Sequence, residues 1–258
     1  MRLPSVSRVV RDLVRESKYV FSSEDLRRLY GLSPFYAYRL VRRLIRDGVA
    51  RRLHRGLFIL DDTFILHVPR EAVIDSLFDK RNYYIGLRYA LLFWKLHDAP
   101  TTTIHVLTNQ RRWSGKQLFI ANEKFQLVYL SDHRFFGYVR VPLGGSMVNI
   151  SDREKTLIDS LLFIGKYVSL GDICKALKLG RGKINVRKMV NYAIRVRNQA
   201  LVQRLGYLLE SAGFSDGLEI LVDHVGKNYV VLNPAKKGVV KNSFKVAKWR
   251  LYVNDRCL

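Results

Sequence analysis

The apolar residues of the first segment of the chain recur at helical intervals, and this pattern predicts a series of three short helices. In the first helix the apolar positions lie three or four residues apart, at Val6, Val9, Val10, Leu13 and Val14. A second helix is expected over residues 24–30, capped by Ser22 or Ser23 and ended by Gly31. A third is expected from Pro34 to about Arg46, because Ser33 is a good N-cap and proline suits the first helical position.

The third predicted helix separates an apolar face from a basic face. The expected buried face consists of Ala37, Leu40, Val41, Leu44 and Ile45, and the opposite face of Tyr36, Arg39, Arg42, Arg43 and Arg46. Two β-rich runs then follow, at residues 49–53 and 57–60, around a basic tip at residues 54–56 that contains a glycine. Helices and a hairpin in this order predict a winged helix-turn-helix over residues 1–68.

Residues 69–258 follow a different pattern, which predicts a second domain of mixed α+β structure. A linking strand is expected at residues 64–68, a buried helix at 84–96, and further strands at 101–107, 125–130 and 135–141. Ser151 and Glu154 form a potential capping box, and helical patterns continue from there to about residue 212. Short strands return between residues 226 and 253. The fold class that we expect for the whole chain is therefore α+β.

The charge balance indicates a polyanionic partner. The chain has 258 residues, with 45 Lys and Arg against 22 Asp and Glu, which gives a net charge of +23. Residues 1–70 hold 15 basic and 7 acidic side chains, residues 71–150 hold 10 and 6, and residues 151–258 hold 20 and 9. The two ends of the chain thus carry most of the excess. Nucleic acid is the partner that we expect, with an anionic membrane surface as the alternative.

The predicted winged helix places polar and basic side chains where such domains contact duplex DNA. The candidate DNA-binding residues are Ser33, Tyr36, Arg39, Arg42, Arg43, Arg46, Arg51, Arg52, His54 and Arg55. The short turn at residues 31–33 sets the third helix across the second, so that the third can enter the major groove. Arginine can form paired hydrogen bonds with guanine or bind phosphates. Two alternatives stay open: the arginines form only a solvated face, or the domain docks a protein.

The sequence offers no set of residues that would support catalysis. The six histidines do not occur at a helical metal-binding spacing, and two cysteines cannot supply a zinc ribbon. The run of Gly and basic residues at 180–183 lacks the spacing of a phosphate-binding loop, and Glu16 with Lys18 lacks the partner strand of a nuclease motif. We therefore expect no enzyme activity, no metal and no cofactor.

Membrane insertion is not expected either. The longest unbroken apolar run covers residues 89–94, far short of the roughly 20 residues that span a bilayer. Residues 1–4 do not begin an apolar signal segment. The expected location is the cytoplasm.

Several stretches resemble the AbiEi family of abortive-infection antitoxins and transcriptional regulators. They are GVARRLHRGLF at 48–58, YIG at 84–86, SDREKTLID at 151–159, RLGYLLE at 204–210, LNP at 232–234 and WRLYVN at 249–254. Their order extends the resemblance over nearly the full chain.

The resemblance implies an N-terminal DNA-binding domain and a C-terminal antitoxin domain of a type IV toxin–antitoxin system. It also implies repression of the protein's own promoter at inverted repeats and neutralisation of a nucleotidyltransferase toxin, with or without direct contact. Two alternatives remain: a stand-alone winged-helix transcription factor, and an RNA-binding or nucleic-acid-processing protein. An RNA-binding surface would carry stacking aromatics, and Tyr36 and Tyr38 are the obvious ones beside the arginines.

Overall fold

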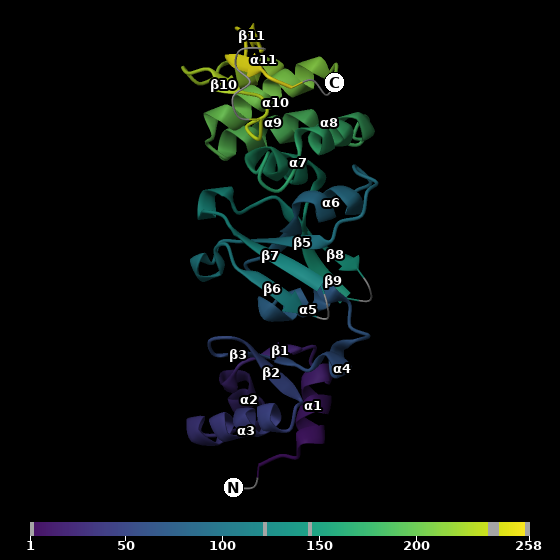
Figure 1. Cartoon of the computed structure of the whole chain (residues 1–258), viewed down its shortest axis with the longest axis vertical. Coiled ribbons are helices and arrows are strands. Elements are labelled where there is room, and N and C mark those ends of the chain that lie inside the picture. The colour runs from purple at the N-terminus through teal and green to yellow at the C-terminus, as the bar shows by residue number, and fades with distance from the viewer. Residues whose placement is uncertain (1–2, 121–122, 144–145, 237–242, 256–258) are drawn as a thin grey trace. The chain divides into compact units, whose positions relative to one another are not determined.

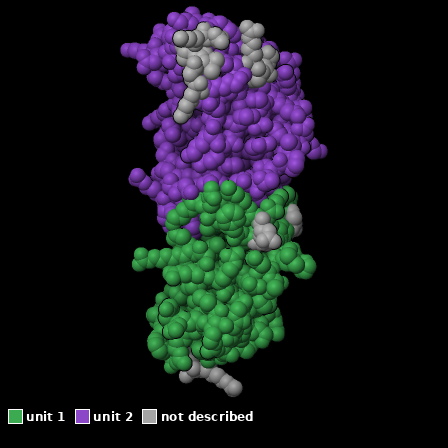
Figure 2. Space-filling model, in the orientation of Figure 1, with its two compact units in different colours: residues 1–83, 116–125, 140–149 green, residues 84–115, 126–139, 150–258 purple. Residues whose placement is uncertain are grey.

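The computed structural model describes residues 3–120, 123–143, 146–236 and 243–255 (Figure 1). The chain divides into two compact units, shown in two colours in Figure 2. The first unit consists of residues 1–83, 116–125 and 140–149, and the second of residues 84–115, 126–139 and 150–258. The observed mixture of helices and sheets confirms the α+β fold class. The predicted domain boundary at residue 68 concerns independent folding and stays a prediction.

A winged helix-turn-helix forms the N-terminal part of the first unit, as the apolar pattern predicts. Its strands form a three-stranded sheet in the order β1-β3-β2, in which β3 pairs antiparallel with both neighbours. In chain order the elements are α1 (Val6–Arg15), β1 (Val20–Phe21), α2 (Ser23–Tyr30), α3 (Pro34–Arg46), β2 (Ala50–His54) and β3 (Leu57–Leu60).

Local capping signals set the ends of α2 and α3. Ser22 and Asp25 form a capping box, in which the Ser22 hydroxyl accepts from the Asp25 N–H at 3.2 Å and Asp25 accepts from the Ser22 N–H at 2.7 Å. Gly31 ends α2 in the left-handed conformation, with φ of 61°. Ser33 then caps α3, and Pro34 occupies its first position. The tight turn between the two helices follows from these three signals.

The core of the winged helix comes from the apolar faces of its helices and from the hairpin. Its fully buried side chains include Val9, Leu13, Leu26, Leu40, Leu44 and Ile59. The expected apolar face of α3 is correct at four positions and wrong at Ile45, which is 40% exposed. Ile45 lies at the edge of the buried face, since the helical repeat turns it away from Leu40 and Leu44.

The rest of the first unit contains α4 (Asp62–Ile65), α5 (Arg70–Leu77) and β6 (Gln117–Ile120), together with parts of three longer strands. The linking strand expected at residues 64–68 is wrong, because the end of the short helix α4 covers Phe64 and Ile65 and a turn follows it. The Asp61 carboxylate accepts from the Thr63 N–H at 3.1 Å and so caps α4. Phe64 and Leu66 are exposed, which is why an apolar run was a misleading signal.

A six-stranded sheet has the order β6-β7-β5-β4-β9-β8. Its remaining strands are β4 (Tyr84–Gly86), β5 (Thr103–Thr108), β7 (Glu123–Tyr129), β8 (Tyr138–Leu143) and β9 (Ser146–Ser151). The helix expected over 84–96 is α6 (Leu87–Phe93), so its first three residues were predicted wrongly. They form β4, which pairs antiparallel with β5 and parallel with β9, and periodicity along the chain does not show such pairing.

The second unit buries its core among its helices, part of the six-stranded sheet and a small C-terminal sheet. Figure 1 shows these elements in green and yellow. The sheet has the order β10-β12-β11. The elements are α7 (Arg153–Leu162), α8 (Leu170–Leu179), α9 (Val186–Arg195), α10 (Gln199–Ser211), α11 (Leu218–Val222), β10 (Val230–Val231), β11 (Phe244–Val246) and β12 (Leu251–Val253), with single 3₁₀ turns η1 (Arg111–Trp113) and η2 (Asp132–Arg134). Trp249 is fully buried and packs against Gly206 on α10.

A fully buried ion pair lies on α7. The Lys155 ammonium contacts the Asp159 carboxylate one helical turn away, and both side chains have no solvent exposure. The Tyr84 hydroxyl donates to Asp159 at 2.8 Å and accepts from Lys155 at 3.0 Å. Burial lowers the pKa of Lys155, while the charge of Asp159 opposes that shift. The helix itself is capped by Asp152, whose carboxylate accepts from the Lys155 N–H, and not by Ser151 as expected.

Candidate nucleic-acid interface

Helix α3 presents one exposed face that combines an aromatic ring with three arginines. We name this set, Phe35, Arg39, Arg42 and Arg46, the α3 stripe. Its members are four, three and four residues apart, a spacing that places them on one side of a helix. Phe35 is 65% exposed and the Arg46 side chain 75%. Since the buried residues of α3 occupy the opposite side, the stripe faces solvent.

Phe35 was not among the residues that the sequence pointed to. Its ring lies 5.7 Å from the guanidinium of Arg39, in cation–π geometry, and 5.6 Å from the ring of Tyr36 in an edge-to-face arrangement. The sequence signal that could have identified Phe35 is an aromatic residue four positions before an arginine, since these two positions are neighbours on a helix surface. The contact restrains Arg39 near the N-terminal end of the helix, where base edges are reached in winged helices.

The arginines of α3 differ in how far they are neutralised. Asp47 lies 3.0 Å from Arg46 and 3.6 Å from Arg43, so one carboxylate offsets part of the charge at the C-terminal end. Within the described ranges Arg39 and Arg42 form no ion pair. The guanidinium groups of Arg39 and Arg42 are therefore available to an external anion.

The N-terminal end of α3 is polar and partly covered. The Ser33 hydroxyl accepts from the Tyr36 N–H at 3.5 Å, so its lone pairs serve the helix cap. Tyr36 is half-buried, whereas Tyr38 is 57% exposed. A role of Ser33 and Tyr36 in DNA binding stays a prediction, and the aromatic rings most open to solvent at this end are Phe35 and Tyr38.

The wing carries two exposed arginines. Arg52 and Arg55 are both exposed, and Gly56 makes the turn with φ of 73°. The register of the hairpin shifts between Arg52 and His54. Both arginines are open to a phosphate backbone.

Two other predicted wing residues contact their own unit. Arg51 donates to Asp62 at 3.4 Å and to the carbonyl oxygen of Phe119 at 3.3 Å. His54 contacts the ammonium of Lys116. A DNA contact by Arg51 or His54 stays a prediction, and it would require these side chains to exchange partners.

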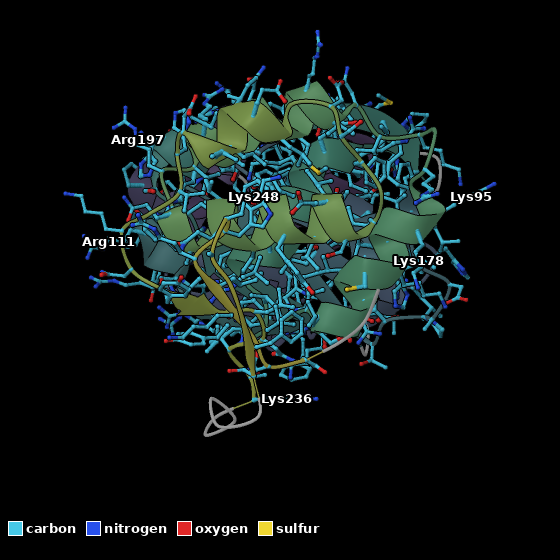
Figure 3. The ribbon with its side chains drawn as sticks, turned by 90° about the horizontal axis from the view of Figure 1, so that it is seen from above. Lys95, Arg111, Lys178, Arg197, Lys236 and Lys248 are labelled. Carbon is cyan, nitrogen blue, oxygen red and sulfur yellow. The ribbon has the colours of Figure 1, made fainter. Side chains whose placement is uncertain are left out.

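The second unit also carries basic side chains on its surface. Seen from above in Figure 3, Lys95, Arg111 and Arg197 point outward at the periphery, and Lys178 is exposed on α8. Lys248 instead lies over the helices, where it contacts Glu210.

Metal-binding and membrane-spanning features are absent from the described residues. In the described ranges no group of three or more His, Cys, Asp or Glu residues could hold a metal ion. None of the helices in those ranges is both long and apolar enough to cross a bilayer.

Comparison with known proteins supports the assignment of the N-terminal domain. Residues 8–60 match the family model described as a transcriptional regulator, AbiEi antitoxin, which confirms the resemblance over the winged helix. No curated protein matches the chain. The crystal structure of the RV2827C protein from Mycobacterium tuberculosis is similar, with a TM-score of 0.58 and 18% identity over 97% of this chain and 92% of that one. At this level of identity the similarity shows the fold alone.

Proposed function

We propose that the chain, whose residues 8–60 match the AbiEi regulators, is a non-enzymatic, sequence-specific regulator of transcription that binds duplex DNA. The observation that carries this proposal is the α3 stripe, which combines exposed arginines with an aromatic ring on the second helix of a helix-turn-helix. Such a helix fits the major groove. The cytoplasm is the location that we propose for such a regulator.

The residues of the interface divide into two roles. Arg39 is assigned to a base edge, because it lies near the N-terminal end of α3, forms no ion pair within the described ranges and is restrained by Phe35. Arg46 and the wing residues Arg52 and Arg55 are assigned to phosphates, because they are exposed and lie farther from the base-reading end.

We further propose that the protein represses its own promoter at inverted repeats and acts as the antitoxin of a nucleotidyltransferase toxin. The description of the matching family supports this assignment. The α3 stripe supports DNA binding equally well in a stand-alone transcription factor. Expression of a neighbouring toxin gene with and without this protein distinguishes the two, since only an antitoxin restores growth.

Duplex binding is tested by fluorescence anisotropy with the protein's own upstream DNA, a random duplex and a single-stranded RNA. The affinity should fall with salt with a log–log slope of roughly −4 to −8 for about five to eight phosphate contacts. Arg15→Ala is a matched control, since Arg15 is 75% exposed on α1 and lies outside the interface. A flat salt response, or a preference for the RNA, contradicts the proposal.

Two variants separate base reading from phosphate binding. Arg39→Ala should cost about 1–3 kcal/mol on the upstream DNA and little on the random duplex. Arg46→Ala should weaken both equally and reduce the salt slope by about one. Equal losses on the two duplexes for Arg39→Ala would show that α3 does not read the sequence.

A further inference from the structure

One stretch of this basic chain has the opposite charge. The 22 residues between Arg204 and Lys227 form the longest stretch of the chain without Lys or Arg. The same stretch carries four carboxylates, Glu210, Asp216, Glu219 and Asp223. It covers the C-terminal part of α10, the following loop and α11. A surface of this composition repels polyanions and attracts cationic groups.

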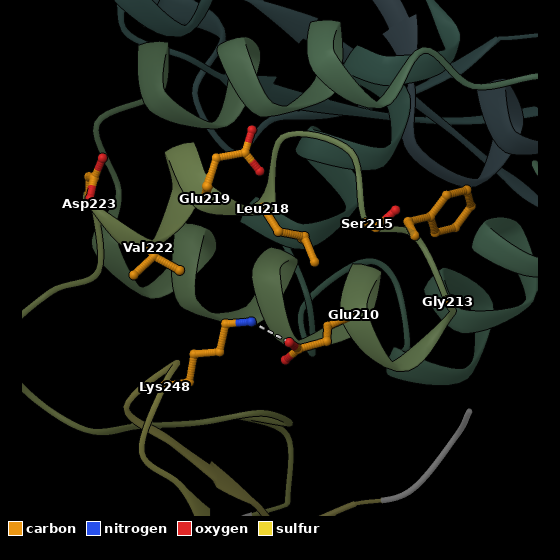
Figure 4. Close-up of a pocket in the computed structure, with 9 residues that line it drawn as sticks. Glu210, Gly213, Ser215, Leu218, Glu219, Val222, Asp223 and Lys248 are labelled. Carbon is orange, nitrogen blue, oxygen red and sulfur yellow. Dashed lines mark hydrogen bonds and ion pairs between the residues drawn. The ribbon is translucent and has the colours of Figure 1, made fainter.

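Three of these carboxylates, Glu210, Glu219 and Asp223, border a pocket with apolar walls, whereas Asp216 is paired with Arg187 outside it. The pocket has a volume of about 780 Å³ and lies between the end of α10, the loop at 213–215, α11 and Lys248 (Figure 4). Phe214, Leu218 and Val222 supply its apolar surface. Val222 is 38% exposed, so part of this apolar wall faces solvent.

The acidic groups of the pocket fall into two classes. Glu210 is already paired: Lys248 contacts it, and the indole N–H of Trp249 donates to it at 2.6 Å. These hydrogen bonds lower the pKa of Glu210, the one from Lys248 most strongly. Glu219 and Asp223, by contrast, form no ion pair with any residue that the structure describes. These two carboxylates beside an apolar wall are thus available to an external cation, although the charge of Glu219 also acts on Arg187.

We propose that this pocket binds a segment of a partner protein in which Lys or Arg alternates with apolar side chains. The apolar side chains and the aliphatic stems of the basic residues would pack on Phe214, Leu218 and Val222, while the cationic ends reach Glu219 and Asp223. A small polyamine satisfies the carboxylates but leaves the apolar wall uncovered. Charge complementarity and the apolar wall together favour the peptide. The inference does not rest on the proposed DNA binding.

The test measures binding of short fluorescent peptides to the full chain by anisotropy at physiological salt, where exposed charges more than about 8 Å apart are largely screened. The first peptide alternates Lys with Leu, the second alternates Lys with Ser, and spermine serves as a competitor. We expect the Lys/Leu peptide to bind more tightly than the Lys/Ser peptide. Carbodiimide cross-linking should join its lysines to Glu219 or Asp223, because the reagent couples only amines and carboxylates that touch.

A matched pair of double variants locates the site. Glu219→Gln/Asp223→Asn removes the two unpaired pocket carboxylates, and Asp98→Asn/Asp132→Asn removes two exposed carboxylates of the same unit outside the pocket. The pocket variant should bind the Lys/Leu peptide on the order of two- to tenfold more weakly, as expected for the loss of two surface ion pairs. The control variant should bind as the wild type does.

Three results would overturn the proposal: equal affinity in the two double variants, equal affinity for the Lys/Leu and Lys/Ser peptides, or no binding of the Lys/Leu peptide. The same variants also separate this inference from the proposed function. Upstream DNA binding should be unchanged in the pocket variant. If the wild type does not bind DNA, the peptide result still stands. If the wild type does not bind the peptide, the DNA result still stands.

Discussion

Replacing Lys155 by Met should destabilise the second unit by about 3–5 kcal/mol, the usual cost of removing one partner of a buried ion pair. Lys155 and Asp159 are both fully buried, and the Lys155 ammonium also lies 4.9 Å from the centre of the Phe136 ring. Met preserves most of the apolar stem, so the packing changes little. The variant leaves the Asp159 carboxyl group in the core without its ion-pair partner. Among the contacts that the structure describes, its remaining hydrogen-bond partner is the Tyr84 hydroxyl.

The assay is urea unfolding followed by tryptophan fluorescence. The three tryptophans, Trp94, Trp113 and Trp249, all lie in the second unit, so the signal reports on that unit alone. With an m-value of about 1–3 kcal/mol/M, the predicted loss lowers the midpoint by roughly 1–5 M urea.

A double variant tests the cause of that loss. Lys155→Met/Asp159→Leu removes both charges and should be more stable than Lys155→Met alone by more than about 1 kcal/mol, because no buried charge is left unpaired. Lys178→Met is the matched control, since Lys178 is exposed on α8. A loss below about 1 kcal/mol for Lys155→Met, or a double variant less stable than the single one, would refute the reasoning.

Three further substitutions test particular contacts. Phe35→Ala should leave stability unchanged and reduce the preference for upstream DNA by about 0.5–1 kcal/mol in anisotropy titrations, because the contact that restrains Arg39 is lost. Gly206→Ala should cost about 1–3 kcal/mol in urea unfolding, because the added Cβ would lie 2.1 Å from the Trp249 ring. Gly31→Ala should cost about 1–2 kcal/mol, measured by hydrogen exchange of α2 and α3, since residue 31 has φ of 61°.

The winged helix could be predicted from the sequence because its determinants are local. The capping box at Ser22, the left-handed Gly31 and the cap at Ser33 all act within one helical turn, and they fix the ends of α2 and α3. The apolar repeat then identifies the buried face. Its error at Ile45 shows the limit of this approach, since a residue at the edge of the face is buried only if another element covers it.

The wrong predictions concern structure that depends on distant partners. Residues 84–86 have a helical apolar pattern, but their backbone pairs with β5 and β9. Tyr84 is paired with Leu107 and Ile85 with Ile150, both far along the chain. The apolar run at 64–68 has no strand partner within the described part of the sheet, and the cap at Asp61 turns its start into a helix. The sheet order could not be predicted for the same reason. In the candidate interface, the contacts of Arg51 and His54 with residues far along the chain were equally invisible.

The independence of the winged helix depends on contacts just beyond the predicted boundary at residue 68. The Ser76 hydroxyl accepts from the Val20 N–H at 3.0 Å and donates to the Val20 carbonyl oxygen at 3.2 Å. Asp79 lies 2.9 Å from the ammonium of Lys18. A fragment of residues 1–68 keeps the helical core but loses these three contacts, whereas a fragment of residues 1–83 keeps them.

Both fragments should therefore fold, with 1–83 the more stable. The two hydrogen bonds of Ser76 contribute about 0.5–1.5 kcal/mol each, and the partly exposed pair of Lys18 and Asp79 adds at most about 1 kcal/mol. Thermal unfolding by circular dichroism should show a difference of about 1–4 kcal/mol, and Ser76→Ala in the longer fragment should remove most of it. If 1–68 matches 1–83 in stability, the edge of β1 needs no support from α5. If neither fragment folds, the winged helix is not a separable domain, because its core then depends on the rest of the first unit.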